Sequence, residues 1–340
     1  MRLDTGNFSL SRLDLLGAVT VAAVGVWTLV AAAGRPSSPE NFLLGLLTVA
    51  AAYAVGRIAG ERSAYGACAA VAGAVAVVFL MSPDALSGHA LAEPLGYGNA
   101  NGALATQAVG AACLAALAAP NERRRGEMHL LAGLLVLGAF ATKSVAAALG
   151  GVAILVIGLT ATAARRRGTL VVAGAVCVAA MALGTVYLGG DKVQHMSGVR
   201  LTAEEGLTQR RLDVWHDALT LAAANPVRGT GPGTFVANSP TARADSDTQA
   251  AHSLWLRQAA EQGYPGLAAM VALVGWAFVR LWRSRQDPAI VAVGAVTLTA
   301  FAVQASMDYV AEFGGVLIAL GVVLGVGTAV PDPVLEKGIR

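Results

Sequence analysis

The sequence predicts an all-α integral membrane protein with about ten transmembrane helices and one long extracytoplasmic loop that contains short helices. Composition is the first reason: hydrophobic residues make up 56% of the 340-residue chain and charged residues only 13%. That charged share is about half of what an ordinary soluble domain carries. The second reason is that the apolar residues form runs of about 20 residues, the length that a helix needs to cross a bilayer.

Ten apolar segments are candidate spans. They are residues 15–33, 42–58, 64–82, 100–119, 129–141, 145–163, 169–189, 264–282, 288–307 and 314–330. The segment at 129–141 is short, which leaves open whether it fully crosses the membrane. The first run has no obvious small-residue cleavage site and is long enough to span, so we interpret it as a retained helix.

Arginine predicts how these helices are oriented. Clusters of arginine lie within residues 57–62, 123–125, 165–167 and 280–285, and they alternate with loops that hold almost no Lys or Arg. Positively charged short loops face the cytoplasm, so we expect these loops and both termini on the cytoplasmic side of the cell membrane. The net charge of +3 is too small to indicate a nucleic-acid partner.

This topology divides the chain into three parts. Residues 1–189 hold about seven membrane helices, residues 190–263 form the long extracytoplasmic loop, and residues 264–340 hold about three helices and a cytoplasmic tail. The long loop contains several arginines, but loops of this length escape the charge rule.

Three patterns follow one another in the long loop. Residues 209–224 predict an amphipathic helix, and residues 225–235, NPVRGTGPGTF, then form a glycine-rich elbow. A second short helix, beginning near 251, leads into the span at 264–282. The elbow lacks the Gly-Lys-Ser/Thr ending of a nucleotide-binding loop and lies on the side without ATP, which excludes a nucleotide site. Its glycines are either a plain turn or a nest of N–H donors for an anion.

The order of these patterns resembles the O-antigen ligase and polymerase superfamily, whose members are multi-span glycosyltransferases that use lipid-linked sugars. The similarity is carried by R-L-x-x-W from Arg211, by the N-P-x-x-G-x-G-P-G-x-F elbow, and by A-H-x-x-x-L with E-x-G-x-x-G-L in residues 251–267. It extends to EPLGYGNANGALA at 93–105, to TKS at 142–144 and to SMDY at 306–309.

The chain departs from the family pattern at two places. Ser253 stands where Asn is usual, and Lys143-Ser144 replaces a Ser-Arg pair. The second change keeps a cation but loses the two-pronged geometry of a guanidinium. The resemblance implies a GT-C-like arrangement, and it covers about residues 90–325.

The resemblance also implies a reaction. A glycan would pass from a polyprenyl (undecaprenyl) diphosphate carrier to an acceptor hydroxyl at the outer face of the cytoplasmic membrane. His252 is the expected general base, and Glu261 or Asp308 would orient it or act in its place. Attack opposite the diphosphate in one step would invert the anomeric centre.

Two further groups of residues are assigned on the same basis. The diphosphate needs cations and hydrogen-bond donors, and those expected are Arg211, Arg210, Lys143 and Gly231. Residues expected to line the substrate cavity are Asn99, Asn101 and Trp215. The two asparagines are equally explained as amides that join helices, and the tryptophan as an anchor at the membrane surface.

No cofactor and no metal site is expected, because the sequence contains no His, Asp and Cys cluster with metal spacing. The expected partners are the lipid-linked glycan donor, a glycan or glycolipid acceptor, and membrane lipid. A polymerase that joins repeat units is an alternative within the superfamily. A lipid or solute transporter is an alternative outside the superfamily, and it is disfavoured because the spans are almost free of charged residues. A noncatalytic scaffold protein is a third alternative.

Overall fold

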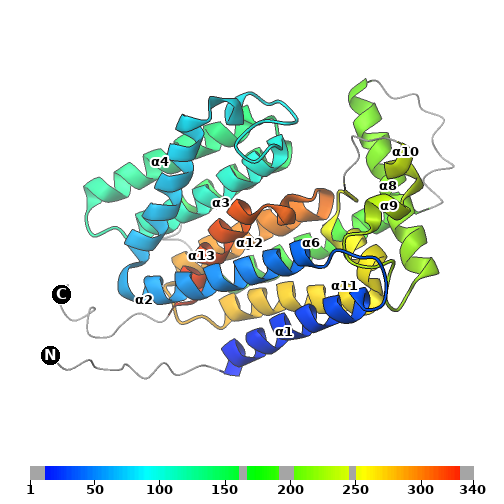
Figure 1. Ribbon diagram of the computed structural model, residues 1–340. Helices are drawn as coiled ribbons and strands as arrows, with labels where there is room; N and C mark the ends of the chain where they lie inside the picture. Colours follow the sequence, from blue (N-terminus) through cyan, green and yellow to red (C-terminus); the bar gives the residue numbers. More distant parts are fainter. Residues whose placement is uncertain (1–11, 161–166, 191–202, 245–249, 330–340) are drawn as a thin grey trace.

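A computed structural model describes residues 12–160, 167–190, 203–244 and 250–329. Within these ranges the regular structure is helical (Figure 1). The N-terminal helices are α1 (Arg12–Ala32), α2 (Glu40–Met81), α3 (Gly98–Leu117), α4 (Glu122–Ala141), α5 (Val145–Thr160) and α6 (Arg167–Gly189), with a short 3-10 turn η1 (Pro83–Leu86). The remaining elements are α8 (Ala203–Ala224), α9 (Phe235–Asn238), α10 (Pro240–Ala244), α11 (Leu254–Trp282), α12 (Pro288–Met307), η3 (Val310–Glu312) and α13 (Gly314–Thr328).

The structure confirms an all-α membrane protein. Six of the described helices, α1, α2, α3, α6, α11 and α12, are long and apolar enough to cross a membrane. The apolar helices α5 and α13 are shorter, and α4 begins with a charged first turn. Each of the ten predicted segments overlaps a helix, although four of them extend one or two described residues beyond the helix end. The count of ten spans stays a prediction.

Two predicted spans, 42–58 and 64–82, lie in the single helix α2. The backbone leaves helical geometry at Ser63 (φ −161°, ψ 92°), where the helix bends. Figure 1 shows the two halves of α2 running in different directions. A similar break divides α11 at Gly263 (φ 70°, ψ −175°), at the boundary predicted between the long loop and the last helices.

Glycines bring α2 and α13 into backbone contact. A Cβ atom at Gly325 would lie 2.4 Å from the carbonyl oxygen of Tyr53, and one at Gly56 would lie 2.6 Å from that of Val322. Small residues of this kind allow membrane helices to pack closely, since lipid tails supply no hydrophobic force between helices. The closely packed helices α2 and α13 form one side of the cavity described below.

Helix α3 is the centre of the bundle. Its sequence is rich in Ala and Gly and has no polar face, and nearly all of its residues are buried, as expected for a helix surrounded by others. It packs against α2, α4, α5, α12 and α13. The first turn of α3 therefore holds Asn99 in a fixed place at one end of the bundle.

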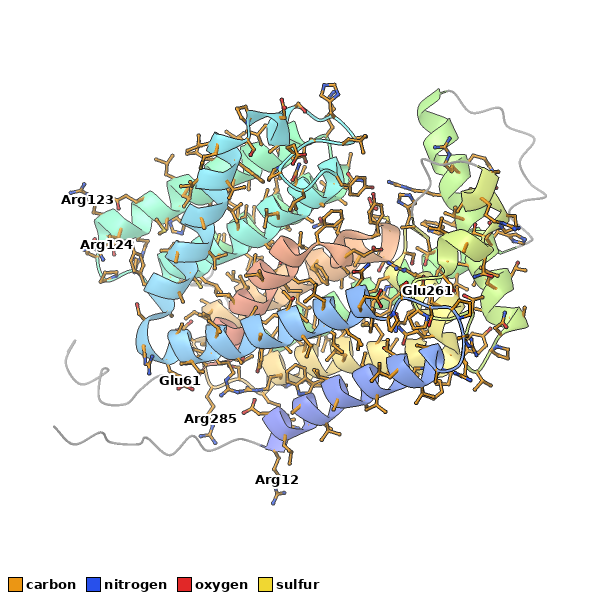
Figure 2. All side chains as sticks on the ribbon, viewed as in Figure 1. Arg12, Glu61, Arg123, Arg124, Glu261 and Arg285 are labelled. Carbon is orange, nitrogen blue, oxygen red and sulfur yellow. The ribbon has the colours of Figure 1, made fainter. Side chains whose placement is uncertain are left out.

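That end of the bundle also carries the helices of the long loop. Figure 1 shows α8, α9 and α10 together at one end. In Figure 2, Arg123, Arg124 and Arg285 lie toward the opposite end from Glu261. The arginine-bearing loops thus share one end, which agrees with the charge pattern, while the membrane orientation itself stays a prediction. Arg165, Arg166 and both terminal segments lie outside the described residues, as do 191–202 and 245–249 of the long loop.

We predict that Gly325→Leu destabilises the bundle, because its side chain would collide with the backbone of α2 at Tyr53. Overpacking of this kind costs about 1–3 kcal/mol. Thermal unfolding of the purified protein in detergent should show a lower midpoint. Gly133→Leu is the control, since a Cβ atom at Gly133 would meet no atom within 4 Å. Equal midpoints for the two variants would contradict the packing argument.

Candidate functional site

The site is built around the buried carboxylate of Asp308, the residue that ends α12. The hydroxyl of Tyr97 donates to both carboxylate oxygens, at 2.9 and 2.7 Å, and the side-chain amide of Asn99 donates to Oδ2 at 2.6 Å. The backbone N–H of Tyr309 donates to Oδ1 at 2.8 Å. Residues from the start of α3 and the end of α12, more than 200 positions apart in the chain, therefore meet at one charge.

The side chains of His252 and Arg211 complete the surroundings of this carboxylate. Nδ1 of His252 lies 3.1 Å from Oδ1 of Asp308. Nη2 of Arg211, on α8, lies 3.6 Å from Oδ2. The side chain of Arg211 is 38% exposed, whereas that of Asp308 is 8% exposed. The carboxylate is thus enclosed, while the guanidinium keeps a face open to a further anion.

These contacts decide the charge of Asp308. Burial by itself raises the pKa of Asp308, because it disfavours the ionised form. The hydrogen bond from His252, the charges of His252 and Arg211, and the Tyr97 hydroxyl act the other way, and together they lower the pKa below its ordinary value of 3.8. Asp308 is therefore a carboxylate at neutral pH.

His252 is held in one orientation. Its backbone has a positive φ of 46°, and its carbonyl oxygen accepts a hydrogen bond from the indole N–H of Trp215 at 3.2 Å. The indole N–H of Trp255 donates to Oγ of Ser306 at 2.7 Å, which joins the start of α11 to the end of α12. With Nδ1 donating to Asp308, neutral His252 has its lone pair on Nε2, the arrangement of an oriented general base.

Aromatic rings form one wall beside this pair. The rings of Tyr97 and Tyr309 are stacked at 4.5 Å, and Phe313 stacks on Tyr97 at 6.0 Å. The edge of Tyr309 meets the ring of His252 at 5.2 Å. Burial, with the neighbouring Asp308 and Glu312 carboxylates, raises the pKa of Tyr309 to about 12. Both tyrosine hydroxyls are therefore neutral hydrogen-bond donors at physiological pH.

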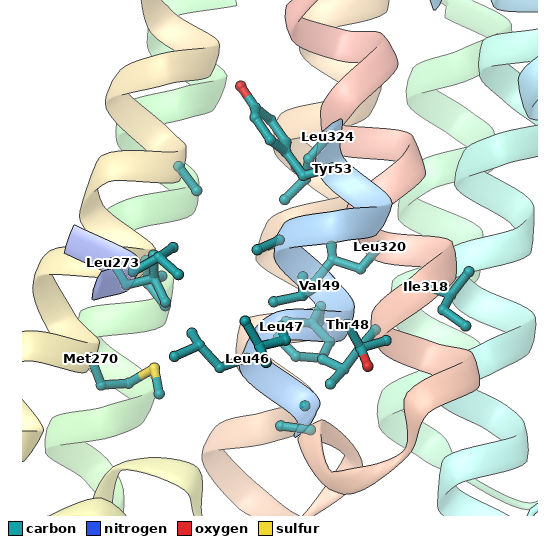
Figure 3. Close-up of a pocket in the computed structure, with 18 of the residues that line it drawn as sticks. Leu46, Leu47, Thr48, Val49, Tyr53, Met270, Leu273, Ile318, Leu320 and Leu324 are labelled. Carbon is teal, nitrogen blue, oxygen red and sulfur yellow. The ribbon is translucent and has the colours of Figure 1, made fainter. Parts of the chain in front are cut away.

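A large apolar cavity reaches His252 from inside the bundle. Its volume is about 2010 Å³, and residues of α1, α2, α11 and α13 line it. Figure 3 shows Met270 and Leu273 of α11 facing Leu46 and Val49 of α2 across this space. The lining includes His252 and polar residues of α11 and η3 at one end, and charged residues of α1 and α2, including Asp14, at the other.

The elbow predicted to bind diphosphate is instead tied to α11. The backbone N–H of Gly231 donates to the carbonyl oxygen of Glu261 at 2.9 Å, and that of Thr230 donates to the carbonyl oxygen of Ala260 at 2.8 Å. The carboxylate of Glu261 accepts from the N–H groups of Gly233 at 2.9 Å and Phe235 at 3.1 Å. The amide donors that would form an anion nest already have partners within the protein.

This geometry does not support two of the expected roles. Gly231 does not offer its N–H to a diphosphate, because Glu261 accepts it. Glu261 is not placed against His252, since its buried carboxylate binds the elbow and Nε of Arg257, at 3.2 Å. Asp308 occupies the orienting position that the sequence left open between the two acids.

Two of the expected cavity residues also have other roles. Asn101 is fully buried, and its amide nitrogen donates to the carbonyl oxygens of Ala92 at 2.8 Å and Glu93 at 3.1 Å, which shapes the loop before α3. Trp215 is buried and supports the backbone of His252. Only Asn99 of the three reaches the Asp308 carboxylate.

The remaining cations lie apart from this carboxylate. Lys143 is an exposed residue with φ 58° in the turn between α4 and α5, and its aliphatic chain packs against Gly88. Thr142, next to it, packs on the first turn of α3 at Gly102, so the turn lies at the same end of the bundle as Asn99. Arg210 is exposed on α8. Within the described ranges, no hydrogen bond or ion pair joins Lys143 to Asp308 or His252.

Sequence reasoning missed three members of the site. Tyr97 lies in the EPLGYGNANGALA motif at 93–105, but the motif gave it no expected role. Tyr309 directly follows Asp308. Arg257 lies four residues before Glu261, a spacing that by itself indicates only an ion pair on one helix face. The sequence offered one signal for Tyr309, namely its position directly after Asp308, an expected catalytic acid. In the described part of the chain, no group of three or more His, Cys, Asp or Glu is arranged to hold a metal ion.

We predict that Glu261→Ala lowers the thermal stability, since it leaves the N–H groups of Gly233 and Phe235 without their acceptor. Each buried donor left unpaired costs about 1–3 kcal/mol. The unfolding midpoint in detergent measures this loss. Glu127→Ala on α4 is the control, because Glu127 is half exposed and bonded only to exposed Arg123 in a surface pair. An unchanged midpoint for Glu261→Ala would contradict the anchoring role.

Comparison with known proteins gives one match. Residues 130–271 match the model of the O-antigen ligase family. That range contains Lys143, α8 with Arg211, the elbow, His252 and Arg257. No curated protein matches the chain. The match confirms the resemblance that the motifs indicate: residues 130–271 of this multi-pass membrane protein are similar to the O-antigen ligase family.

Proposed function

We propose that this protein transfers a glycan from a polyprenyl diphosphate carrier to an acceptor hydroxyl at the outer face of the cytoplasmic membrane. The observation that carries the proposal is the Asp308–His252 pair, which lies beside Arg211 at the end of a large apolar cavity. The family match supports a role in glycan assembly. An apolar cavity that ends at a base and a cation suits a lipid with an anionic, glycosylated head.

His252 acts as the general base in this proposal. The acceptor oxygen attacks the anomeric carbon and gives its proton to Nε2 of His252. The bond between that carbon and the diphosphate oxygen breaks, and its electron pair leaves with the diphosphate. Asp308 holds Nδ1 and stabilises the imidazolium that forms. Because a single displacement occurs opposite the leaving group, the product has the inverted configuration.

Arg211 is the first cation for the departing diphosphate, because its side chain is partly exposed and its contact with Asp308 is long. A guanidinium can bind phosphate oxygens with two parallel hydrogen bonds. Lys143 and Arg210 supply further positive charge at the same end of the bundle. The diphosphate is already a good leaving group, so the reaction needs neither ATP nor a metal ion.

A ligase and a polymerase share this chemistry and differ only in the acceptor. A lipid transporter is a second candidate, favoured by one observation: the cavity lining runs from Asp14 and Arg57 to His252, so it passes along the height of the bundle. A transporter would move the lipid without breaking the glycosyl bond. The experiment below therefore measures whether the glycosyl bond of the donor is broken and the glycan is transferred.

The test measures glycan transfer by purified protein from a polyprenyl diphosphate-linked oligosaccharide to candidate acceptors, with and without EDTA. We expect His252→Ala to reduce the rate by about 10²–10⁴-fold, the usual contribution of a general base. We expect Arg211→Ala to reduce it by about 10²–10³-fold, as for a lost transition-state charge contact. EDTA should have no effect.

The matched controls are His89→Ala, an exposed histidine in the loop before α3, and Arg243→Ala, an exposed arginine on α10. Both should keep the wild-type rate. Transfer by all four variants at equal rates would refute the catalytic roles. Absence of transfer with every acceptor, together with movement of the lipid across vesicle membranes, would support the transporter.

A second prediction concerns pH. The pKa of Asp308 is lowered, so its ionised form contributes stability at neutral pH, and this contribution is lost as pH falls through its folded-state pKa, below 3.8. Asp308→Asn removes the negative charge that holds Nδ1 of His252 and stabilises the imidazolium that forms in the reaction. We expect a lower kcat for this variant. A wild-type kcat would argue against the pairing.

A further inference from the structure

Arg257 places a further cation at the end of the cavity that contains His252. Arg257, on the first turn of α11, lines the cavity together with His252. Its Nε is 3.2 Å from Oε1 of Glu261, and its Nη1 is paired with Oε1 of Glu312 on η3. The side chain is 26% exposed. A cation is therefore held at the place where the apolar lining meets the proposed base.

The two carboxylates that hold Arg257 are not equivalent. Glu261 is 6% exposed and also binds two backbone N–H groups of the elbow, so it is fixed. Glu312 is 43% exposed, lies on a three-residue turn and lines the cavity. Burial raises the pKa of Glu312, and the attraction of Arg257 only partly opposes this while the Glu261 charge adds to it. Glu312 is the partner that an incoming anion can replace.

A second observation points to a ligand at the same place. Gln258, the next residue, lines the cavity and is 3% exposed, and its side-chain Nε2 has no hydrogen-bond partner. A buried amide donor without an acceptor is costly, because its hydrogen bonds to water are lost and not replaced. An acceptor oxygen bound in the cavity would satisfy it. Arg257 and Gln258 thus offer a charge and a donor to an anion.

The shape of the cavity identifies the class of anion. Below Arg257 the lining is apolar, with Leu273 and Met270 on one wall and Leu46 on the other. A small soluble anion gains nothing from such a lining, whereas a lipid places its chain along it and its phosphate at the cation. Guanidinium groups bind phosphate oxygens with two parallel bonds, which makes a phosphate a strong competitor for the place of Glu312.

We propose that Arg257 and Gln258 bind the diphosphate of the polyprenyl donor at the outer end of the cavity, and that the diphosphate displaces Glu312 from Arg257. The identity of the lipid as donor rests on the proposed function. The donor head then lies between Arg257 on the cavity side of His252 and Arg211 on the Asp308 side. Glu312 keeps Arg257 paired when no donor is bound, which avoids an uncompensated charge at the edge of the membrane.

The test is equilibrium binding of radiolabelled geranylgeranyl diphosphate to the full-length protein in detergent, without acceptor. We expect Arg257→Gln to weaken binding about tenfold or more, because a charge-assisted contact is lost. We expect Glu312→Gln to strengthen binding severalfold, since the competing charge is removed. Arg243→Gln, on the exposed face of α10, should leave binding unchanged. Arg257→Lys keeps the charge and should lie between wild type and Arg257→Gln.

The direction of the Glu312→Gln effect separates binding from folding, because damage to the fold cannot tighten a complex. Weaker or unchanged binding in Glu312→Gln would overturn the displacement, and unchanged binding in Arg257→Gln would overturn the site. Geranylgeraniol that binds as tightly as the diphosphate would also overturn it. Competition by phosphatidylglycerol at equal concentration would identify a phospholipid site and overturn the donor assignment.

The binding measurement tests the diphosphate site separately from the glycan-transfer assay, which tests the proposed function. If transfer occurs but Arg257→Gln binds normally, the proposed function stands and this inference fails. If the predicted binding changes occur but no acceptor receives glycan, the diphosphate site stands and the transferase proposal fails. His252→Ala links the two, because it should abolish transfer while geranylgeranyl diphosphate still binds.

Discussion

The end of the bundle that carries the long loop depends on one buried negative charge. Removing a carboxylate from water is costly unless hydrogen bonds and opposite charges replace the water. Asp308 receives them from four parts of the chain: Tyr97 and Asn99 at the start of α3, Arg211 on α8, His252 before α11 and its own backbone neighbour. Because each partner must be in place, the carboxylate fixes the relative positions of these elements, and His252 gains its orientation from the same requirement.

The glycine-rich elbow has a structural meaning that its sequence does not reveal. A Cβ atom at Gly229 would lie 2.3 Å from the carbonyl carbon of Glu261, and one at Gly263 would lie 2.3 Å from the carbonyl oxygen of Val227. Both glycines have positive φ. The elbow and the break in α11 therefore press backbone against backbone, which only glycine permits. This contact holds the start of α11, and with it His252 and Arg257, over the end of the cavity.

The cavity has an ionic contact at each end. At the end opposite His252, Asp14 of α1 pairs with Arg57 of α2 and, at 3.0 Å, with Arg280 of α11. The indole N–H of Trp276 donates to the carbonyl oxygen of Leu13 at 2.8 Å. These bonds join α1, α2 and α11 where α1 and α2 otherwise touch little. They keep the helices around the apolar lining together, so a lipid chain would have a defined space along the height of the bundle.

The sequence by itself determined the class of the protein, the helical segments and several of the polar residues that the fold gathers at one end of the bundle. These follow from local properties: apolar runs of bilayer length, arginine clusters in alternate loops, and motifs that occur in the same order as in the O-antigen ligase and polymerase superfamily. It also named His252, Asp308, Arg211 and Asn99, which the fold brings together.

Only the tertiary structure decided which acid serves His252 and what the elbow does. Glu261 is nine residues from His252 in the chain and Asp308 is 56 away, yet it is Asp308 that contacts the imidazole. The break at Gly263 and the turn of the elbow direct the Glu261 carboxylate to the backbone of Gly233 and Phe235 instead. Spacing along a chain sets which residues share a helix face, but contacts between α3, α8, α11 and α12 arise from packing, and no local pattern encodes them.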